Sequence, residues 1–260
     1  MKQKIITPVI KKRFSNIKEY ISQMLVNFEE EPVHNFRTEI KKLQAFLRLL
    51  NAGHNKDQLS VTKKMKVYYW YAGNIRNLQL HVKSINETEG GKPAVYLKSV
   101  KKQVESLQGV LRSLHSPSNF DEPQKMIRNW VAEPGKPSVK KLVYQKIDEF
   151  KHLLTLMKQD EILHAIRKLL KDILYNWKYI KEYSSLLPPA ISGKKQIAEL
   201  TVILGEFCDR ITGIHILEAY VVATPDPADK EILEKLISKW DTEKNDLRLK
   251  VYTMLNYNPA

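Results

Sequence analysis

A histidine followed by basic residues at helical spacing is the pattern in this sequence best suited to chemistry. Its members are His34, Arg37, Lys41 and Arg48. At about 100° per residue, these side chains project within about 60° of one another on a helix. Such a row of cations suits an extended anion, because Arg offers paired N–H donors and Lys a mobile point charge. The histidine can donate to phosphate and gains charge when a bound anion raises its pKa.

The same pattern recurs 130 residues later in the chain. Its members are His164, Arg167, Lys168, Lys171 and Lys178. A second pair of landmarks keeps nearly the same offset, since Gly73 and Gly205 are 132 residues apart. Two landmarks at nearly one spacing indicate an internal duplication.

Each basic stripe lies opposite apolar residues at helical spacing, so each helix is expected to bury one side and expose its cations. Similar spacing elsewhere predicts helices at about residues 9–30, 32–51, 59–85, 94–115, 138–157, 160–183, 194–222 and 228–255. No stretch shows the two-residue alternation of a strand. We therefore predict an all-α fold of two four-helix units that arise from internal duplication and are related by a pseudo-twofold axis.

Residues 116–137 contain the densest group of prolines and glycines and form the expected connector between the halves. A short helix from Met126 to Ala132 is expected within it. We predict one domain over residues 1–260, with a first repeat at 9–115 and a second at 138–257.

The charge is unevenly distributed. The net charge is +14, of which residues 1–120 contribute +12 and the remainder +2. This concentration favours an anionic partner. The single cysteine, Cys208, excludes an intramolecular disulfide and a Cys-based zinc site and is expected in the core. We expect a cytoplasmic protein, because the N-terminus lacks an apolar run of signal-peptide length and no segment has 18 uninterrupted apolar residues.

These motifs resemble the CHAD family, the conserved-histidine α-helical domain, from about residue 10 to 255. The family's His, Arg at +3 and basic residues at +7 and +8 correspond to His34, Arg37, Lys41 and Lys42. In the second half, His164, Arg167 and Lys171 match, but Asp172 replaces the last cation.

A second family segment, Leu-Gly-x-x-Arg-Asp, is approximated in both halves. The first half keeps Gly73 and Arg76, and the second keeps Gly205 and Asp209. Lys66 matches a further basic position, whose counterpart in the second half is Ala198; Gln44 stands where another Arg is usual.

The resemblance implies a helical domain that binds inorganic polyphosphate in a basic central groove, without catalysis and without a cofactor. The expected binding residues are His34, Arg37, Lys41, Lys42, Arg48, Lys66, Arg76, His164, Arg167, Lys168, Lys171 and Lys178. Other polyanions and polyphosphate-metabolising proteins are further expected partners, and association with polyphosphate granules is an expected location.

Two enzymatic or metal-binding interpretations of the acidic residues are disfavoured by the sequence. Glu31 and Glu161 each precede a stripe histidine with the Glu-x-x-His spacing of di-iron bundles, but Glu31 precedes Pro32 and is expected outside the helix. A polyphosphate-cleaving enzyme would need acidic metal ligands, and the Glu87-Thr88-Glu89 run breaks the pattern of the triphosphate-tunnel enzymes.

Nonspecific nucleic-acid binding is the main alternative. The basic runs at residues 63–66 and 101–102 could contact phosphates. Tyr69, Trp70 and Tyr71, however, are expected in the core and at its margin rather than as a stacking platform.

Overall fold

The computed structural model describes residues 3–52, 59–88, 91–114, 136–223 and 226–258. Within these ranges the chain forms helices and no strand, which confirms the predicted all-α class. The helices are α1 (Gln3–Asn27), α2 (Glu30–Asn51), α3 (Lys63–Glu87), α4 (Ala94–Ser113), α6 (Lys136–Thr155), α7 (Asp160–Tyr175), α8 (Trp177–Ile180), α9 (Lys194–Ala223) and α10 (Pro227–Met254), with 3-10 turns at Lys181–Leu186 and Pro189–Ile191.

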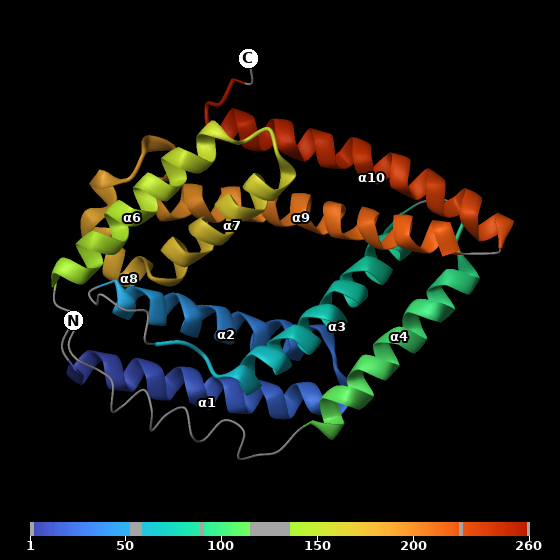
Figure 1. The fold of residues 1–260 in the computed structure, drawn as a ribbon, viewed down its shortest axis with the longest axis horizontal. Helices are drawn as coiled ribbons and strands as arrows, with labels where there is room; N and C mark the ends of the chain where they lie inside the picture. The colour runs from blue at the N-terminus through green and yellow to red at the C-terminus, as the bar shows by residue number, and fades with distance from the viewer. Residues whose placement is uncertain (1–2, 53–58, 89–90, 115–135, 224–225, 259–260) are drawn as a thin grey trace.

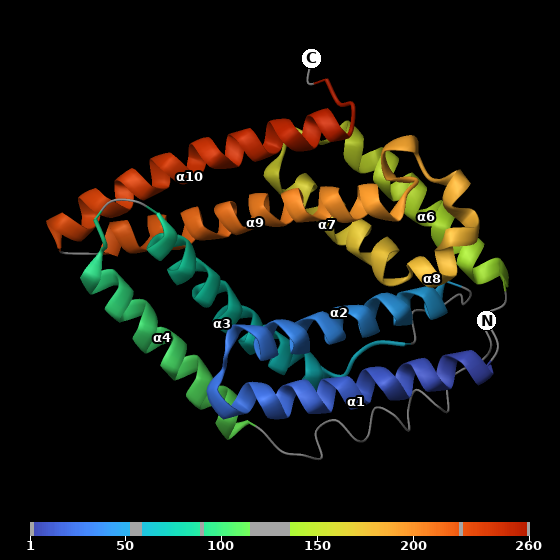
Figure 2. The same cartoon turned by 180° about the vertical axis from the view of Figure 1, so that it is seen from behind.

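The long helices form two antiparallel pairs joined by oblique helices. Figure 1 shows α1 beside α2 along one edge of the molecule and α9 beside α10 along the opposite edge. Helices α3 and α4 run obliquely from the first pair to the second, and Figure 2 shows the same arrangement from behind. Helix α2 contacts α3 and α7, and α9 contacts the same two helices. These four helices therefore close a ring.

Acidic residues begin the two helices that carry the histidine stripes. Glu30 and Glu31 stand in the first turn of α2, and Asp160 and Glu161 in that of α7. Carboxylates there offset the partial positive charge of a helix N-terminus. Helix α2 starts two residues before Pro32, which is tolerated in the first turn because its missing N–H would have no intrahelical acceptor. The expectation that Glu31 lies outside the helix is wrong.

Two further helix starts, those of α3 and α10, follow from capping residues. Thr62 Oγ1 accepts a hydrogen bond of 3.2 Å from Met65 N at the start of α3. Asp226 accepts from the N–H groups of Ala228 and Asp229 at the start of α10. Such caps satisfy N–H groups that the helix itself leaves unpaired.

The hydrophobic core is shared by the two halves of the chain. Phe14, Phe36, Phe150 and Phe207 are almost fully buried and belong to one large cluster that draws on both halves. A smaller cluster around Trp240 occupies the end where α3 and α4 meet α9 and α10. Within the described ranges, no helix combines the length and apolarity that a membrane span requires.

The predicted helix at 160–183 is wrong in its second half. Helix α7 ends at Tyr175, followed by the short α8 and a 3-10 turn. Asn176 is buried at the break, and its Nδ2 donates a hydrogen bond of 2.9 Å to Ala45 O on α2. This contact between distant parts of the chain accompanies the break at Asn176, and the local apolar pattern does not reveal it. Lys178 consequently lies beyond α7.

Four expectations lie outside what the structure describes or tests. The short helix predicted from Met126 to Ala132 falls in the undescribed range 115–135. The internal duplication, the pseudo-twofold axis and the repeat boundaries remain predictions.

Candidate functional site

The two histidine stripes face the same space inside the helical ring. Helix α2 supplies His34, Arg37 and Lys41, and α7 supplies the second stripe. Lys41 lies close enough to Arg167 and Lys171 of α7 for their charges to help lower its pKa. Lys171 acts in the same way on His34. The stripes therefore interact across the opening.

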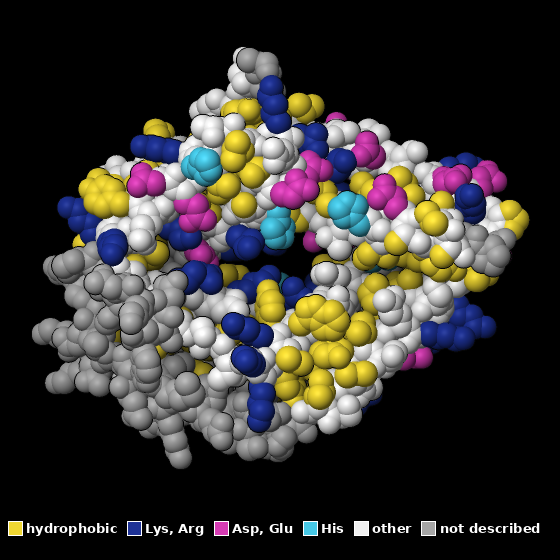
Figure 3. Space-filling view, in the orientation of Figure 1, with side chains coloured by type: hydrophobic (Ala, Val, Ile, Leu, Met, Phe, Trp, Pro, Cys, Tyr) yellow, Lys and Arg dark blue, Asp and Glu magenta, His cyan; other side chains and the backbone are white. Residues whose placement is uncertain are grey.

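We call the grouped side chains the basic cluster. Its members are His34, Arg37, Lys41, Arg76, His164, Arg167, Lys168 and Lys171. Figure 3 shows a hollow near the middle of one face of the molecule, bordered by Lys and Arg side chains with His side chains beside it.

Burial and neighbouring cations destabilise the protonated side chains of the basic cluster. Burial lowers the pKa of Lys41 to about 8, with further lowering by Arg37, Arg167 and Lys171. Burial also lowers the pKa values of Arg37 and Lys171. These shifts mean that the protonated side chains lose hydration and repel one another.

The histidines are affected in the same direction. Restricted hydration lowers the pKa of His34, and Arg76 and Lys41 add to the effect. His164 responds likewise, with Lys168 and Arg167 as its nearest repulsive neighbours. Both rings are therefore expected to be neutral in the unliganded protein at neutral pH.

Each stripe arginine lies against a glycine of a neighbouring helix. A Cβ at Gly73 on α3 would collide with Nη1 of Arg37. A Cβ at Gly205 on α9 would lie 3.4 Å from Nη2 of Arg167. The two landmarks that keep the offset in the sequence thus have the same spatial role, because each lets a guanidinium group pack against a helix backbone.

The two guanidinium groups also retain unused hydrogen-bonding capacity. Nη1 of Arg37 and Nε of Arg167 are buried and have no hydrogen-bond partner in the described part of the chain. Arg37 Cζ lies 5.1 Å from the centroid of the Tyr69 ring, a favourable cation–π contact. Tyr69 is not among the predicted site residues, although its position four residues before Gly73 on one helix could have indicated it.

One carboxylate belongs to the same environment. Asp209 on α9 is influenced by Arg167, Arg76, Arg210 and Lys41, all of which lower its pKa. Surrounding protein limits the hydration of the carboxylate more strongly, and the net effect is a raised pKa. Asp209 matches the family segment but was not expected among the binding residues.

Four predicted binding residues lie elsewhere. Lys42 Nζ binds Glu39 Oε1 at 2.7 Å, and Glu39 also binds Arg13. Arg48 pairs with Asp172. Lys66 and Lys178 are exposed, and no contact with the basic cluster is described for either. The structure therefore gathers eight of the twelve predicted residues.

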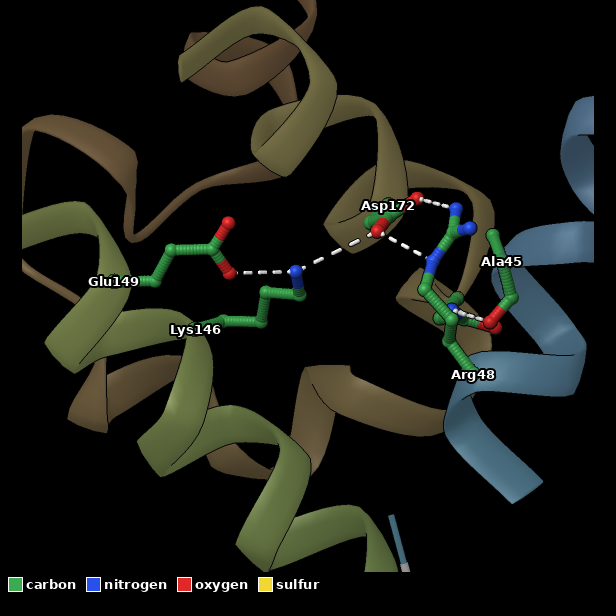
Figure 4. A network of polar contacts seen from close by, with 6 residues as sticks. Ala45, Arg48, Lys146, Glu149 and Asp172 are labelled. Carbon is green, nitrogen blue, oxygen red and sulfur yellow. Dashed lines mark hydrogen bonds and ion pairs between the residues drawn. The ribbon is translucent and has the colours of Figure 1, made fainter. Parts of the chain in front are cut away.

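Asp172, which replaces an expected cation, joins the two halves. Figure 4 shows that its carboxylate forms ion pairs with Arg48 of α2 and with Lys146 of α6. Lys146 Nζ lies 3.5 Å from Asp172 Oδ2 and 2.8 Å from Glu149 Oε2. This network lies beside the hydrogen bond from Asn176 to Ala45 and ties α2 to α6 and α7.

The donor set of the cluster suits an anion. Its side chains donate hydrogen bonds and carry positive charge, and Asp209 is the carboxylate described among them. Across the described residues, no three His, Cys, Asp or Glu side chains are grouped so as to hold a metal ion. Cys208 is buried as expected, and burial raises the pKa of its thiol to about 11.

Fold and site together define an all-helical protein with cations gathered inside a ring of helices. The model of the CHAD domain family matches residues 8–218, so the chain belongs to the CHAD family. A similar solved structure is the crystal structure of the CHAD domain from the plant Ricinus communis, with a TM-score of 0.71 and 13% identity over 98% of this chain and 91% of that chain. At this identity the likeness concerns the fold alone. A search of curated proteins gave no match.

We predict that Lys41→Met stabilises the unliganded protein. At pH 7 Lys41 is charged in both states, and its lowered folded-state pKa means that folding works against burial and repulsion of that charge. The free energy of unfolding is expected to increase by about 1–3 kcal/mol at pH 7, and this increase should vanish as the pH rises toward about 10.5. Denaturant unfolding at the two pH values measures it.

Lys42→Met is the matched control, because Lys42 is ion-paired with the buried Glu39 and its loss should destabilise the protein. If both substitutions shift stability in the same direction, Lys41 does not carry the repulsion inferred for it.

Proposed function

We propose that this protein binds inorganic polyphosphate in the opening lined by the basic cluster, and that it does so without catalysis. The observation that carries the proposal is the gathering of cations from α2, α3 and α7 around one partly dehydrated space, where their charges lie close enough to act on one another. A bound polyanion offsets the repulsion between these charges, whereas a neutral ligand does not.

Polyphosphate matches the arrangement better than a single phosphate does. The cations of each stripe are three or four residues apart and rise about 1.5 Å per residue along the helix, so together they form a track rather than a single point. A linear chain carries about one negative charge per phosphate, and can therefore meet His34, Arg37 and Lys41 in turn and then the facing stripe. Membership of the CHAD family supports the same ligand, as the resemblance implies.

A binding role is proposed rather than hydrolysis. The cluster supplies donors that hold phosphate oxygens, while its described carboxylate, Asp209, lies among cations. We further propose a cytoplasmic location near polyphosphate granules and an association with proteins that make or consume polyphosphate.

We predict that Arg37→Met weakens polyphosphate binding more than Arg167→Met does. Each change removes a charge-assisted contact of about 1.5–3 kcal/mol and, by analogy with single-stranded nucleic acid, reduces the salt slope by roughly 0.7. Arg167 lies beside Asp209, which already offsets part of its charge. Met retains most of the apolar stem, so the fold is preserved.

Titration calorimetry at several salt concentrations measures both effects. Lys102→Met is the control, since Lys102 is exposed on α4 and carries the same charge. Affinity that falls equally in all three variants would indicate a diffuse response to net charge and would remove the basic cluster from the proposal.

Nonspecific nucleic-acid binding is the alternative, and one observation favours it. Trp70 is 57% exposed, contrary to its expected place in the core and its margin, and it lies on the same helix as the exposed Lys63, Lys64 and Lys66. An exposed aromatic ring beside cations can stack on a base. We nevertheless predict that polyphosphate displaces single-stranded DNA far more readily than DNA displaces polyphosphate.

A fluorescence competition assay with both ligands at matched phosphate concentration decides between them. Easier displacement by DNA, abolished by Trp70→Ala, would make nucleic acid the preferred ligand.

We predict two pH effects on polyphosphate affinity. A bound anion raises the pKa of each histidine, so affinity increases as pH falls; the lowered pKa values of His34 and His164 place this increase below pH 6.5, the ordinary histidine value. Affinity also falls above about pH 8, where Lys41 loses its proton in the free protein.

Lys41→Arg should abolish the alkaline decrease, and the double change His34→Gln and His164→Gln the acidic increase. A pH profile unaltered by these changes would show that the three side chains do not bind through their charge.

A further inference from the structure

A small polar pocket lies between α3, α9 and α10, next to the basic cluster. Its volume is about 50 Å³, room for roughly three to five water molecules or for one tetrahedral oxyanion. The lining residues that bear on its chemistry are His81 of α3, Asp209, Arg210 and Gly213 of α9, and Trp240 of α10. The positive charges of the basic cluster also act on the Asp209 carboxylate, so this residue lies where the pocket and the cluster meet.

Two residues that line the pocket each have a buried ring nitrogen with no hydrogen-bond partner among the described residues. His81 is 4% exposed and Trp240 is 1% exposed. Nδ1 of His81 and Nε1 of Trp240 have no hydrogen-bond partner in the described part of the chain. A buried N–H without an acceptor is costly, so these two atoms indicate a guest that supplies oxygen.

The protonation of His81 follows from its other contact. Its Nε2 shares a hydrogen bond with the hydroxyl of Tyr96, and burial lowers the pKa of the ring to about 4, so the ring is neutral. If the Tyr96 hydroxyl donates to Nε2, the ring proton lies on Nδ1. If Nε2 instead donates to the Tyr96 oxygen, both the Nδ1 lone pair and the hydroxyl proton of Tyr96 are left unpaired. The first assignment leaves fewer buried groups unsatisfied. Two residues that line the pocket, His81 and Trp240, then each carry an N–H donor without an acceptor in the described part of the chain.

The sequence makes room for these donors. A Cβ at Gly213 would lie 2.7 Å from Trp240 Cζ3 and 3.5 Å from His81 Nδ1. Glycine therefore lets the indole approach α9. Arg210 adds a positive charge, with Cζ 5.3 Å from the centroid of the Trp240 ring and Nε 2.6 Å from Glu243 Oε2.

A guest of this pocket must accept hydrogen bonds from N–H groups and donate one to the Asp209 carboxylate. A terminal phosphate does both, because its second proton leaves only near about pH 6. An internal phosphate has two bridging oxygens and no O–H at neutral pH.

We propose that this pocket is a subsite for the protonated terminal phosphate of a polyphosphate chain, with Trp240 and His81 donating to its oxygens and Asp209 accepting from its hydroxyl. This inference rests on the proposed function, since the basic cluster would hold the rest of the chain.

The first test uses wild-type protein and inorganic phosphate. Nitrogen-15 labelling of tryptophan gives four indole N–H resonances, one for each Trp in the sequence, and Trp240→Phe assigns the one from the pocket. At pH 6, saturable movement of the Trp240 resonance with phosphate supports the subsite. An unmoved Trp240 resonance, or movement confined to another indole, shows that the pocket holds water only and overturns the proposal.

The second test compares a ligand that has ends with one that has none. Linear tripolyphosphate has two terminal phosphates, and cyclic trimetaphosphate has three internal ones. Their charges differ, so the informative quantity is the ratio of the two affinities in each variant. Trp240→Phe should reduce the linear-to-cyclic ratio by at least about tenfold, while Trp70→Phe, which changes an exposed indole, should leave it unchanged.

Asp209→Asn provides a second variant, because it removes the accepting carboxylate charge while keeping the size and shape of the side chain. It should lower the ratio while increasing affinity for the cyclic ligand, since a repulsive charge is removed. Ratios unchanged in both Trp240→Phe and Asp209→Asn overturn the subsite.

The two proposals fail in different ways. If long-chain polyphosphate binds with full sensitivity to Arg37→Met but the ratios do not change, only the subsite is wrong. If long-chain polyphosphate does not bind wild-type protein at all, the proposed function is wrong, whatever the Trp240 resonance does with inorganic phosphate.

Discussion

Repulsion between cations that face each other across the helical ring is the constraint on which the structure depends. Side chains from α2, α3 and α7 hold positive charge in a space where hydration is limited, and several pKa values fall as a result. The ring must therefore be held closed by interactions made elsewhere. The large hydrophobic cluster shared by both halves supplies most of that stabilisation.

Ion pairs outside the opening assist the core and also determine which cations remain inside it. Glu39 engages Lys42 and Arg13 between α1 and α2. Asp172 engages Arg48 and Lys146, and so links α2 to the second half. The sequence motif alone would assign Lys42 and Arg48 to the site, but Glu39 and Asp172 hold these two side chains in ion pairs outside it. Exchanging a cation for Asp172 thus gives up one positive charge in the stripe and gains a cross-link between distant helices.

The sequence predicted most of the helices because apolar spacing, capping residues and prolines are local signals. It also identified the two stripes and the pair of glycines at one offset, since these features repeat along the chain. It missed the break at Asn176, which a hydrogen bond to Ala45 accompanies, and the pairing of Arg48 with Asp172, because both depend on residues more than one hundred positions apart. The pocket around His81 and Trp240 was missed for the same reason: no local pattern shows that α3, α9 and α10 leave buried N–H groups without partners.

The crowded cations also bear on how long the protein persists in a cell. A folded state that carries repelling charges is less stable when empty, and a polyanion that binds only this state shifts the folding equilibrium toward it. Proteases act on the unfolded fraction, so occupied molecules survive longer than empty ones. The abundance of such a protein would then follow the supply of its ligand without any change in its synthesis.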